Sequence, residues 1–172
     1  MGVLETARDV DPPEWVVGAG VIRNVVWDDL HGYTEPTAVQ DVDVAFFDPA
    51  DVSRERDAAL ERELADRAPK IPWEVTNQAG VHLWYEAKFG YPIPPARSIE
   101  DAVGMWPETA TSVAVRLTSE GNLDVIAPLG LGDLFGLVLR RNPRQITREF
   151  FLQRLREKQV EARWPLVQVV HD

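Results

Sequence analysis

Two aspartates separated by a single residue are the side chains of this sequence best suited to chemistry. Asp41 and Asp43 flank Val42 in a β-branched run that predicts a strand at 41–47. Alternate residues of a strand point to one face, so the two carboxylates would lie about 6–7 Å apart along the chain. Mg²⁺ takes one or two carboxylates and leaves its other positions to water and phosphates, and Mn²⁺ also prefers oxygen ligands. The pair therefore predicts an Mg²⁺ (or Mn²⁺) site, with two acids at a solvated strand end as the alternative.

A glycine-containing turn upstream of this strand could bind phosphate. Gly18-Ala19-Gly20 joins a predicted strand at 15–17 to a predicted helix at 21–31. Such a junction exposes backbone N–H groups and the positive end of the helix dipole, which attract phosphate. The run completes neither the dinucleotide-binding fingerprint nor the P-loop. A tight turn that merely needs glycine is therefore the alternative interpretation.

Hydrophobic periodicity predicts alternating strands and helices around these residues. Strands are predicted at 15–17, 41–47, 73–76, 112–118, 123–126 and 137–139, and helices at 21–31, 54–67, 78–89, 98–107, 133–135 and 146–163. The turn at 120–122 makes a hairpin of two of the strands. A hairpin beside strand–helix–strand units indicates a mixed sheet flanked by helices. We expect an α+β (α/β-like) fold in a single domain over 1–172, with a C-terminal helix at about 146–163.

Composition narrows the kinds of partner and metal site. The chain carries a net charge of -10 and contains no Cys and only three His residues. A thiolate zinc site is excluded, and a hard cation held by carboxylates remains open. A long nucleic acid is an unlikely partner, because phosphate binding needs a Lys/Arg surface. The acidic start of the chain and the absence of an apolar run near ~20 residues predict no membrane span and a cytoplasmic location.

The order of the motifs resembles the polymerase-β-like nucleotidyltransferase superfamily. The run from Gly18 to Asn24, followed by Asp41-Val42-Asp43, is similar to the head of tRNA nucleotidyltransferases. Further motifs recur in order in a bacterial "nucleotidyltransferase family protein" group of small stand-alone domains, at 27–32, 41–48, 77–79, 106–111, 127–131 and 164–165. The resemblance covers nearly the whole chain from Trp15 to Pro165. It implies a metal-dependent nucleotidyltransferase that moves a nucleoside monophosphate from a nucleoside triphosphate to an unknown hydroxyl acceptor.

The resemblance also assigns roles to single residues. Gly18, Gly20 and Arg23 would bind the phosphates; Arg23 would be a charge-assisted donor or, alternatively, form a salt bridge to Asp28 or occupy a helix surface position. Asp41 and Asp43 would hold the metal ion. Glu74 falls where the superfamily has a third catalytic carboxylate; an exposed strand residue is the other interpretation, and Glu108 is a weaker rival for the role.

Two departures from the family pattern leave a second function open. Gly80 stands where a basic residue is expected after Asn77-Gln78-Ala79, and Asn24 replaces an acid. Gly80, together with the two interpretations of the third acid, favours the alternative of a catalytically inactive domain of the same fold that binds nucleotide or another protein.

Overall fold

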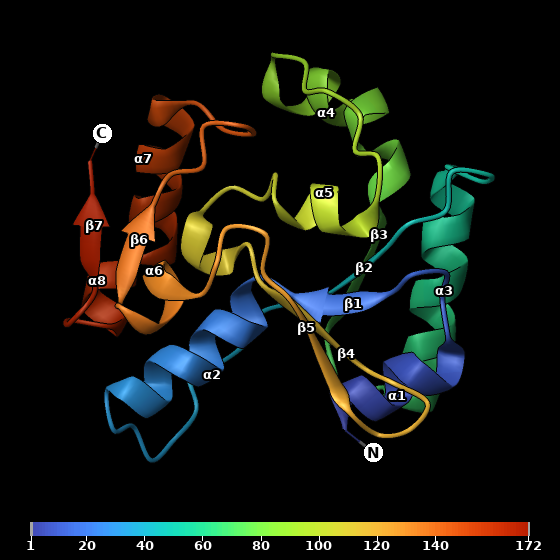
Figure 1. The fold of residues 1–172 in the computed structure, drawn as a ribbon, viewed down its shortest axis with the longest axis horizontal. Helices are drawn as coiled ribbons and strands as arrows, with labels where there is room; N and C mark the ends of the chain where they lie inside the picture. The colour runs from blue at the N-terminus through green and yellow to red at the C-terminus, as the bar shows by residue number, and fades with distance from the viewer. Residues whose placement is uncertain (1, 172) are drawn as a thin grey trace.

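A five-stranded mixed sheet forms the centre of the computed structural model, which describes residues 2–171 (Figure 1). Its strands are β1 (Val16–Gly18), β2 (Val42–Phe46), β3 (Trp73–Asn77), β4 (Ala114–Leu117) and β5 (Leu123–Ile126), in the order β3-β2-β1-β4-β5. β2 and β3 are parallel, and the other neighbours are antiparallel. The predicted mixed sheet is thus confirmed.

Helices and a second, smaller sheet surround this centre. The helices are α1 (Val3–Val10), α2 (Gly20–Leu30), α3 (Arg54–Arg67), α4 (Val81–Phe89), α5 (Ile99–Val103), α6 (Gly132–Phe135), α7 (Arg148–Lys158) and α8 (Val160–Arg163), with 3₁₀ turns η1 (Gln78–Gly80) and η2 (Thr109–Thr111). β6 (Val138–Arg140) and β7 (Gln168–Val170) pair in parallel. Within residues 2–171, none of the helices has the length and apolar character needed to span a bilayer.

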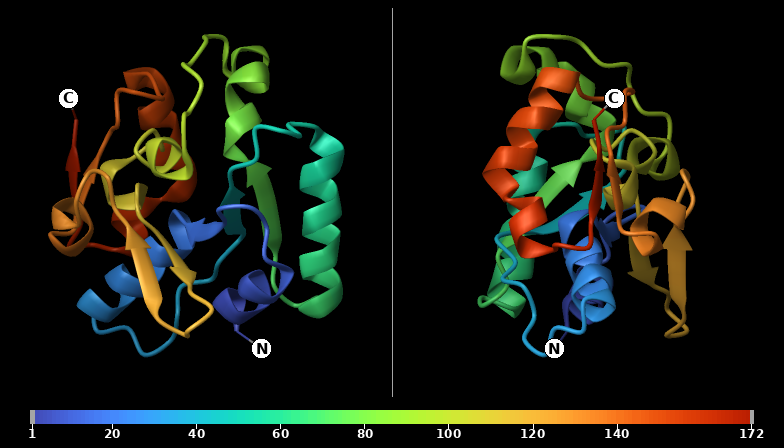
Figure 2. Two further views of the ribbon diagram at one scale, coloured as in Figure 1. Left: turned by 45° about the vertical axis from the view of Figure 1, so that its right-hand side comes forward. Right: turned by 90° about the vertical axis from the view of Figure 1, so that its left-hand side faces the viewer.

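Strand alternation divides the central sheet into an apolar face and a face that carries the acids. Val42, Val44 and Phe46 of β2 are buried in one cluster with Leu60 and Leu64 of α3. The intervening residues of β2 point to the opposite face, because neighbouring side chains of a strand alternate. Figure 2 shows α3 on one side of the sheet and α5 on the other. The helices α1 and α3 therefore anchor the strand and leave its polar side chains facing away from them.

The C-terminal elements pack on α2 rather than on the sheet. Trp27 of α2 and Trp164, which follows α8, are fully buried and meet edge to face with their ring centroids 5.4 Å apart. Trp27 Nε1 donates to the carbonyl of Leu134 at 2.8 Å. Phe151 of α7 belongs to the same buried cluster. This contact brings α7 to the side of the sheet that carries the acids.

Some predicted elements differ from the observed ones. The predicted helix at 146–163 is divided into α7 and α8 by Gln159, whose φ of 48° is left-handed. The predicted strand at 112–118 is shortened, because Ser112 follows η2 and its hydroxyl donates to the carbonyl of Glu108. α1 and β7 were not predicted.

Candidate active site

Three of the residues singled out from the sequence form a row across neighbouring strands. Gly18 of β1 pairs with Asp43 of β2, and Asp43 lies opposite Glu74 of β3. Paired residues project to the same side of a sheet, and Asp41 shares that side because it lies two residues from Asp43. Asp41, Asp43 and Glu74 all line one cavity of about 290 Å³. The structure thus brings the three carboxylates together.

Several other elements complete the walls of this cavity. Its lining is Ala19, Gly20, Asp41, Asp43, Val44, Ala45, Glu74, Thr76, Gln78, Val81, Trp84, Trp106, Pro107, Glu108, Thr111, Gln145, Arg154 and Lys158. Three of the acids come from β2, β3 and the residue just before β2, the fourth, Glu108, precedes η2, and the two cations come from α7. The cavity is therefore polarised, with negative charge on one wall and positive charge on another.

Asp43 is the carboxyl group most strongly affected by this setting. Its side chain is half-buried on β2. Burial, reinforced by the charges of Asp41 and Glu74, raises the pKa of Asp43 to about 7, and Lys158 and Arg154 only partly oppose this. Bringing a cation between the acids would relieve the repulsion that raises this pKa.

The carboxylate oxygens that the sheet presents to the cavity fit a hard divalent cation. Asp41 and Asp43 supply two carboxylates in the same cavity. Among residues 2–171, no three His, Cys, Asp or Glu side chains converge into a ready-made metal site. Mg²⁺ needs no such cage, because one or two carboxylates suffice when water and substrate phosphates supply the remaining ligands. The residues present therefore suit a metal that is bound together with a phosphorylated substrate.

The turn before α2 presents backbone to the cavity at Ala19 and Gly20. Ala19 adopts φ 55° and ψ -123°, a conformation usual only for glycine. It is held there because its N–H donates to the carbonyl of Val113 and its own carbonyl accepts from the N–H of Arg23. Gly20 opens α2, which has 11 residues, so the positive end of its dipole lies at the cavity wall.

Gly18 shapes the cavity indirectly rather than lining it. A Cβ on Gly18 would lie 2.5 Å from the ring of Trp106 and 2.9 Å from the carbonyl of Val113. Glycine is therefore needed here for the close approach of Trp106, which does line the cavity. This packing role, and not contact with the cavity, is what the structure shows for the first glycine of the turn.

Arg23 also lies outside the cavity lining. Its side chain is 4% exposed, and its guanidinium donates to Asn24 Oδ1 at 2.8 Å. The guanidinium carbon lies 4.9 Å from the ring centroid of Trp164 and 5.5 Å from that of Trp27. Asp28, the alternative partner considered from the sequence, instead accepts hydrogen bonds from Thr37 and from Trp164 Nε1. Arg23 is thus a buried cation beneath the Ala19–Gly20 turn.

Sequence reasoning missed the cations of α7, and it considered Glu108 only as a rival for the third carboxylate and not as the partner of one of these cations. Arg154 and Lys158 are four residues apart and share one face of α7. Arg154 Nε donates to Glu108 Oε1 at 2.7 Å, and Thr111 Oγ1 donates to Glu108 Oε2 at 2.9 Å. Burial acts to raise the pKa of Glu108, but the charge and hydrogen bond of Arg154 outweigh it and lower the pKa. The i, i+4 spacing in a predicted helix was the only available signal.

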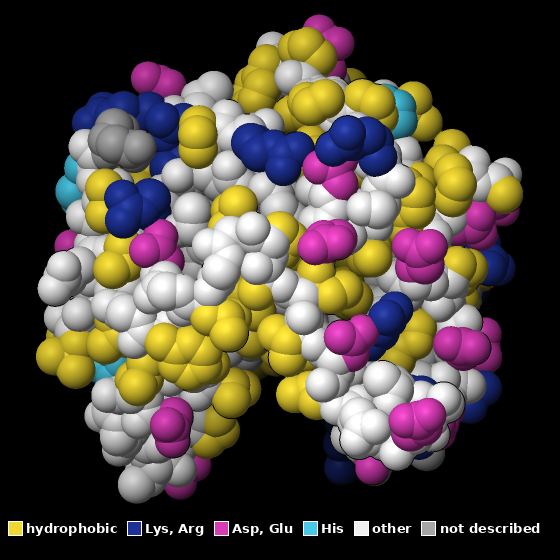
Figure 3. Space-filling view, viewed as in Figure 1, with side chains coloured by type: hydrophobic (Ala, Val, Ile, Leu, Met, Phe, Trp, Pro, Cys, Tyr) yellow, Lys and Arg dark blue, Asp and Glu magenta, His cyan; other side chains and the backbone are white. Residues whose placement is uncertain are grey.

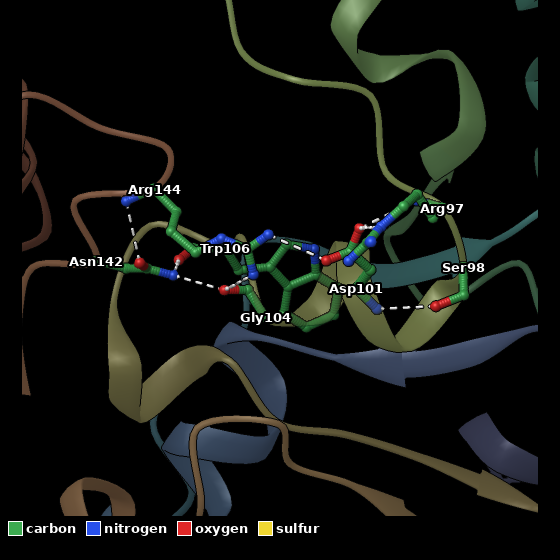
Figure 4. Close-up of polar contacts among 7 residues, drawn as sticks. All are labelled: Arg97, Ser98, Asp101, Gly104, Trp106, Asn142 and Arg144. Carbon is green, nitrogen blue, oxygen red and sulfur yellow. Dashed lines mark hydrogen bonds and ion pairs between the residues drawn. The ribbon is translucent and has the colours of Figure 1, made fainter.

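A polar cluster behind the cavity fixes the segment that carries Trp106 (Figure 4). Asn142 Nδ2 donates to the carbonyls of Gly104 and Trp106 at 2.9 and 2.8 Å. Arg144 Nη2 lies 3.0 Å from Asp101 Oδ1, and Arg97 Nε lies 3.2 Å from Asp101 Oδ2. These contacts hold the end of α5 and the following turn in place over Gly18.

Carboxylates on one face of two neighbouring strands, beside a glycine turn that opens a helix, define a site of the polymerase-β-like nucleotidyltransferase class. Residues 5–169 match the profile of a family described as "Nucleotidyltransferase", and the chain belongs to this family. Membership indicates an enzyme. The search of curated proteins gave no match.

Solved structures agree on the fold. A structure described as revealing "a CCA-adding enzyme head domain" is 28% identical, with a TM-score of 0.80 over 98% of this chain and 87% of that chain. A CCA-adding enzyme with CTP is 15% identical, with a TM-score of 0.54 over 96% of this chain and 38% of its own. A tRNA nucleotidyltransferase with a primer tRNA and an incoming ATP analogue is 18% identical, with a TM-score of 0.53 over 98% of this chain and 46% of that chain.

The chain spans less than half the length of the last two proteins, whose likeness therefore concerns the fold. The resemblance and the fold class predicted from the sequence are both confirmed. The expectation that long nucleic acid is not a partner receives no support, since one of these structures contains tRNA.

Proposed function

We propose that the protein is a metal-dependent nucleotidyltransferase that transfers a nucleoside monophosphate from a nucleoside triphosphate to a hydroxyl group. The observation that carries the proposal is the meeting of Asp41, Asp43 and Glu74 with the Ala19–Gly20 turn in one cavity. Family membership supports the reaction class.

In this proposal the two aspartates hold Mg²⁺ or Mn²⁺ together with the phosphates of the nucleotide. The metal ion, when bound, would polarise the phosphoryl oxygens and offset their charge. The N–H group of Gly20 binds a phosphate oxygen at the positive end of α2, whereas the N–H of Ala19 is engaged by the carbonyl of Val113. Gly18 keeps Trp106 in the wall, and Arg23 adds buried positive charge beneath the turn.

The proposed reaction is an in-line displacement at the α-phosphorus. The acceptor oxygen forms the new bond, the bond from the α-phosphorus to the bridging oxygen breaks, and pyrophosphate leaves with its electron pair. Glu74, which is exposed at the end of the row, takes the proton of the acceptor hydroxyl as a general base. A third metal ligand is the alternative role for this carboxylate.

The acceptor is the least constrained part of the proposal. The net charge of -10 argues against a long nucleic acid. The tRNA in one similar structure argues for including an RNA 3′ end among the substrates tried. An acceptor screen should therefore contain tRNA, short oligonucleotides, small hydroxyl metabolites and protein hydroxyls, in a cytoplasmic extract as well as in buffer.

Calorimetry of a nucleoside triphosphate with and without Mg²⁺ tests the metal site. Asp43→Asn should weaken Mg²⁺-dependent binding at least about tenfold, or ~1.4 kcal/mol, because it removes one of two ligands. Asp66→Asn is the matched control, since Asp66 is exposed on α3, on the opposite side of the sheet. Equal affinity of the two variants would defeat the assignment.

An inactive nucleotide-binding domain is the second candidate, and one observation favours it. Gly80 is buried, and a Cβ there would lie 3.1 Å from Cβ of Val52, so the position leaves little room for the expected basic side chain. Release of pyrophosphate separates the candidates. The enzyme produces it with at least one acceptor, and an inactive domain binds the triphosphate without producing any.

A further inference from the structure

Three cations surround a single acid on the side of the cavity opposite the sheet. Arg154 and Lys158 of α7 line the cavity, and Arg23 lies behind it. The negative charge of Glu108 acts to raise the pKa of all three cations. The positive charge of Arg154 acts to lower the pKa of Arg23 and of Lys158. Glu108 offsets only one of these charges, so the cluster keeps a net positive charge.

This positive charge is not part of a broad basic surface. The whole chain has a net charge of -10, and acidic and basic side chains are interspersed on the face drawn in Figure 3. The carboxylates of the sheet line the same cavity, but the two cations of α7 form a wall of their own and present a local positive field there. The placement therefore indicates an anionic ligand that enters the cavity.

Lys158 lacks a partner of its own. No hydrogen bond or ion pair joins its ammonium to any other side chain of residues 2–171. Burial lowers the pKa of Lys158, the charge of Arg154 lowers it further, and only Glu108 and Asp41 oppose the shift. Half-buried lysines are normally paired, because desolvating an ammonium without a partner is unfavourable. An unpaired ammonium facing the acids of the sheet is thus ready to accept a ligand oxygen.

Arg154 is held differently from Lys158. Its ion pair with Glu108 fixes the guanidinium, because Glu108 is 3% exposed and is itself bound by Thr111. Only Nε makes a short bond to the carboxylate, at 2.7 Å, whereas Nη2 lies 3.5 Å from it. The remaining N–H groups of the guanidinium fork are available to a second anion.

We propose that Lys158 and Arg154 bind the β- and γ-phosphates of the nucleotide, with Glu108 positioning Arg154. The inference rests on the proposed function, since it names how the same site recognises its triphosphate. A metal–triphosphate complex matches both walls of the cavity: its cation faces Asp41 and Asp43, and its excess negative charge faces α7. The C-terminal helix thereby supplies the positive side chain that Gly80 does not.

Selectivity for phosphate number tests this proposal. Affinities for a nucleoside triphosphate and for the matching monophosphate are measured by calorimetry in saturating Mg²⁺, with inorganic triphosphate as a probe without a base. Lys158→Met should weaken binding of both triphosphates on the order of tenfold or more, because a charge-assisted hydrogen bond is lost. Affinity for the monophosphate should stay within about twofold.

Lys70→Met is the matched control, because it removes the same charge from an exposed turn that does not line the cavity. Lys158→Arg should retain most of the preference for triphosphate. Lys158→Gln serves as a second variant if the Met variant does not fold. Thermal unfolding without ligand should show no loss of stability on removal of the unpaired ammonium.

The possible outcomes separate the two proposals. If the wild-type protein binds no nucleoside triphosphate with Mg²⁺, the proposed function itself fails. If it binds triphosphate and both the Lys158 and Lys70 variants bind it equally well, the inference about α7 is overturned and the proposed function stands. Equal weakening of mono- and triphosphate binding also overturns the inference, because it indicates a structural role.

Discussion

Trp106 reaches the cavity only because the residue beneath it has no side chain. Its ring lies where a Cβ of Gly18 would be, and Asn142 fixes the backbone that carries it. The indole Nε1 of Trp106 donates to Gln78 Oε1 at 3.3 Å. The first glycine of the turn therefore controls the position of a wall residue, whereas the second leaves the turn open to solvent and ligand.

Gly18→Ala tests this difference between the two glycines. The added methyl group would overlap Trp106 and the Val113 carbonyl, so we expect a loss of about 1–3 kcal/mol in the free energy of unfolding. Gly20→Ala is the control, since the nearest atom to its Cβ is Arg23 Nη2 at 3.8 Å. Urea denaturation measures both, and equal losses would show that Trp106 does not set the requirement.

Glu74→Gln separates the two roles considered for the third carboxylate. As a general base, Glu74 would be needed for turnover but not for binding, so the rate of pyrophosphate release should fall about 10²- to 10⁴-fold with unchanged Mg²⁺–triphosphate affinity. A metal ligand would lose affinity as well. Glu86→Gln on the exposed side of α4 is the control. Full activity of the Glu74 variant would exclude both roles.

At the scale of elements, α5 is held by the ion pairs that surround its first turn. Hydrogen bonds from Arg97 and Arg144 lower the pKa of Asp101 to about 2, below its ordinary value of 3.8. Its N–H also donates to the capping hydroxyl of Ser98. The charged form of Asp101 therefore stabilises the junction between α5 and the Trp106 segment.

Asp101→Asn should lower stability in a pH-dependent way. A carboxylate with a depressed pKa stabilises the fold above its unfolded pKa and loses this effect as the pH falls through the folded value. The variant should thus be less stable than wild type at pH 7 by up to about 1 kcal/mol, since such pairs are largely solvated. The difference should shrink between about pH 4 and 2. Urea denaturation measures the difference in unfolding free energy across this range, and a difference that stays constant would contradict the assignment.

Elements with their own local signals were predictable from the sequence. α3 has its predicted bounds, because Ser53 caps the helix and Leu60 and Leu64 face the core. α1 and β7 were missed because they are short, and the stability of such segments comes from tertiary packing. The interruption at Gln159 was missed because neither Gly nor Pro marks it.

The candidate site was predictable only where strand geometry determines it. Asp41, Asp43 and Glu74 meet because side chains alternate along β2 and because β3 is its parallel neighbour. Glu108 and Arg154 are 46 residues apart, and no local pattern connects them. Their pairing depends on how α7 docks on α2, which the sequence pattern does not encode in any single segment.

At the scale of the whole molecule, a buried aromatic contact joins the segment after α8 to α2. Trp164 is fully buried against Trp27, lies under the Arg23 guanidinium and donates to Asp28 at 2.7 Å. Removing it would leave a large cavity and would take one of its hydrogen bonds from Asp28 Oδ1, which the Thr37 hydroxyl would still bind. The stability of the site on α7 and the stability of α2 are therefore linked.

Trp164→Ala should lower the free energy of unfolding by about 3–5 kcal/mol, as expected for loss of a fully buried indole. Unfolding should remain a single transition by both fluorescence and circular dichroism, because the C-terminal elements share a core with α2. Trp84→Ala, a change at a partly exposed ring, is the control. Two separate transitions in the wild-type protein would show that the halves fold independently.

The two walls of the cavity come from distant parts of the chain, which sets an order of events during biosynthesis. The aspartates leave the ribosome roughly ten seconds before Lys158, at about ten residues per second. A nascent chain that exposes only the acidic wall repels nucleotides, which carry the same sign of charge. On the proposed function, the complete site for substrate thus forms only once the last helical turns have docked, because the cations of α7 then join the acidic wall.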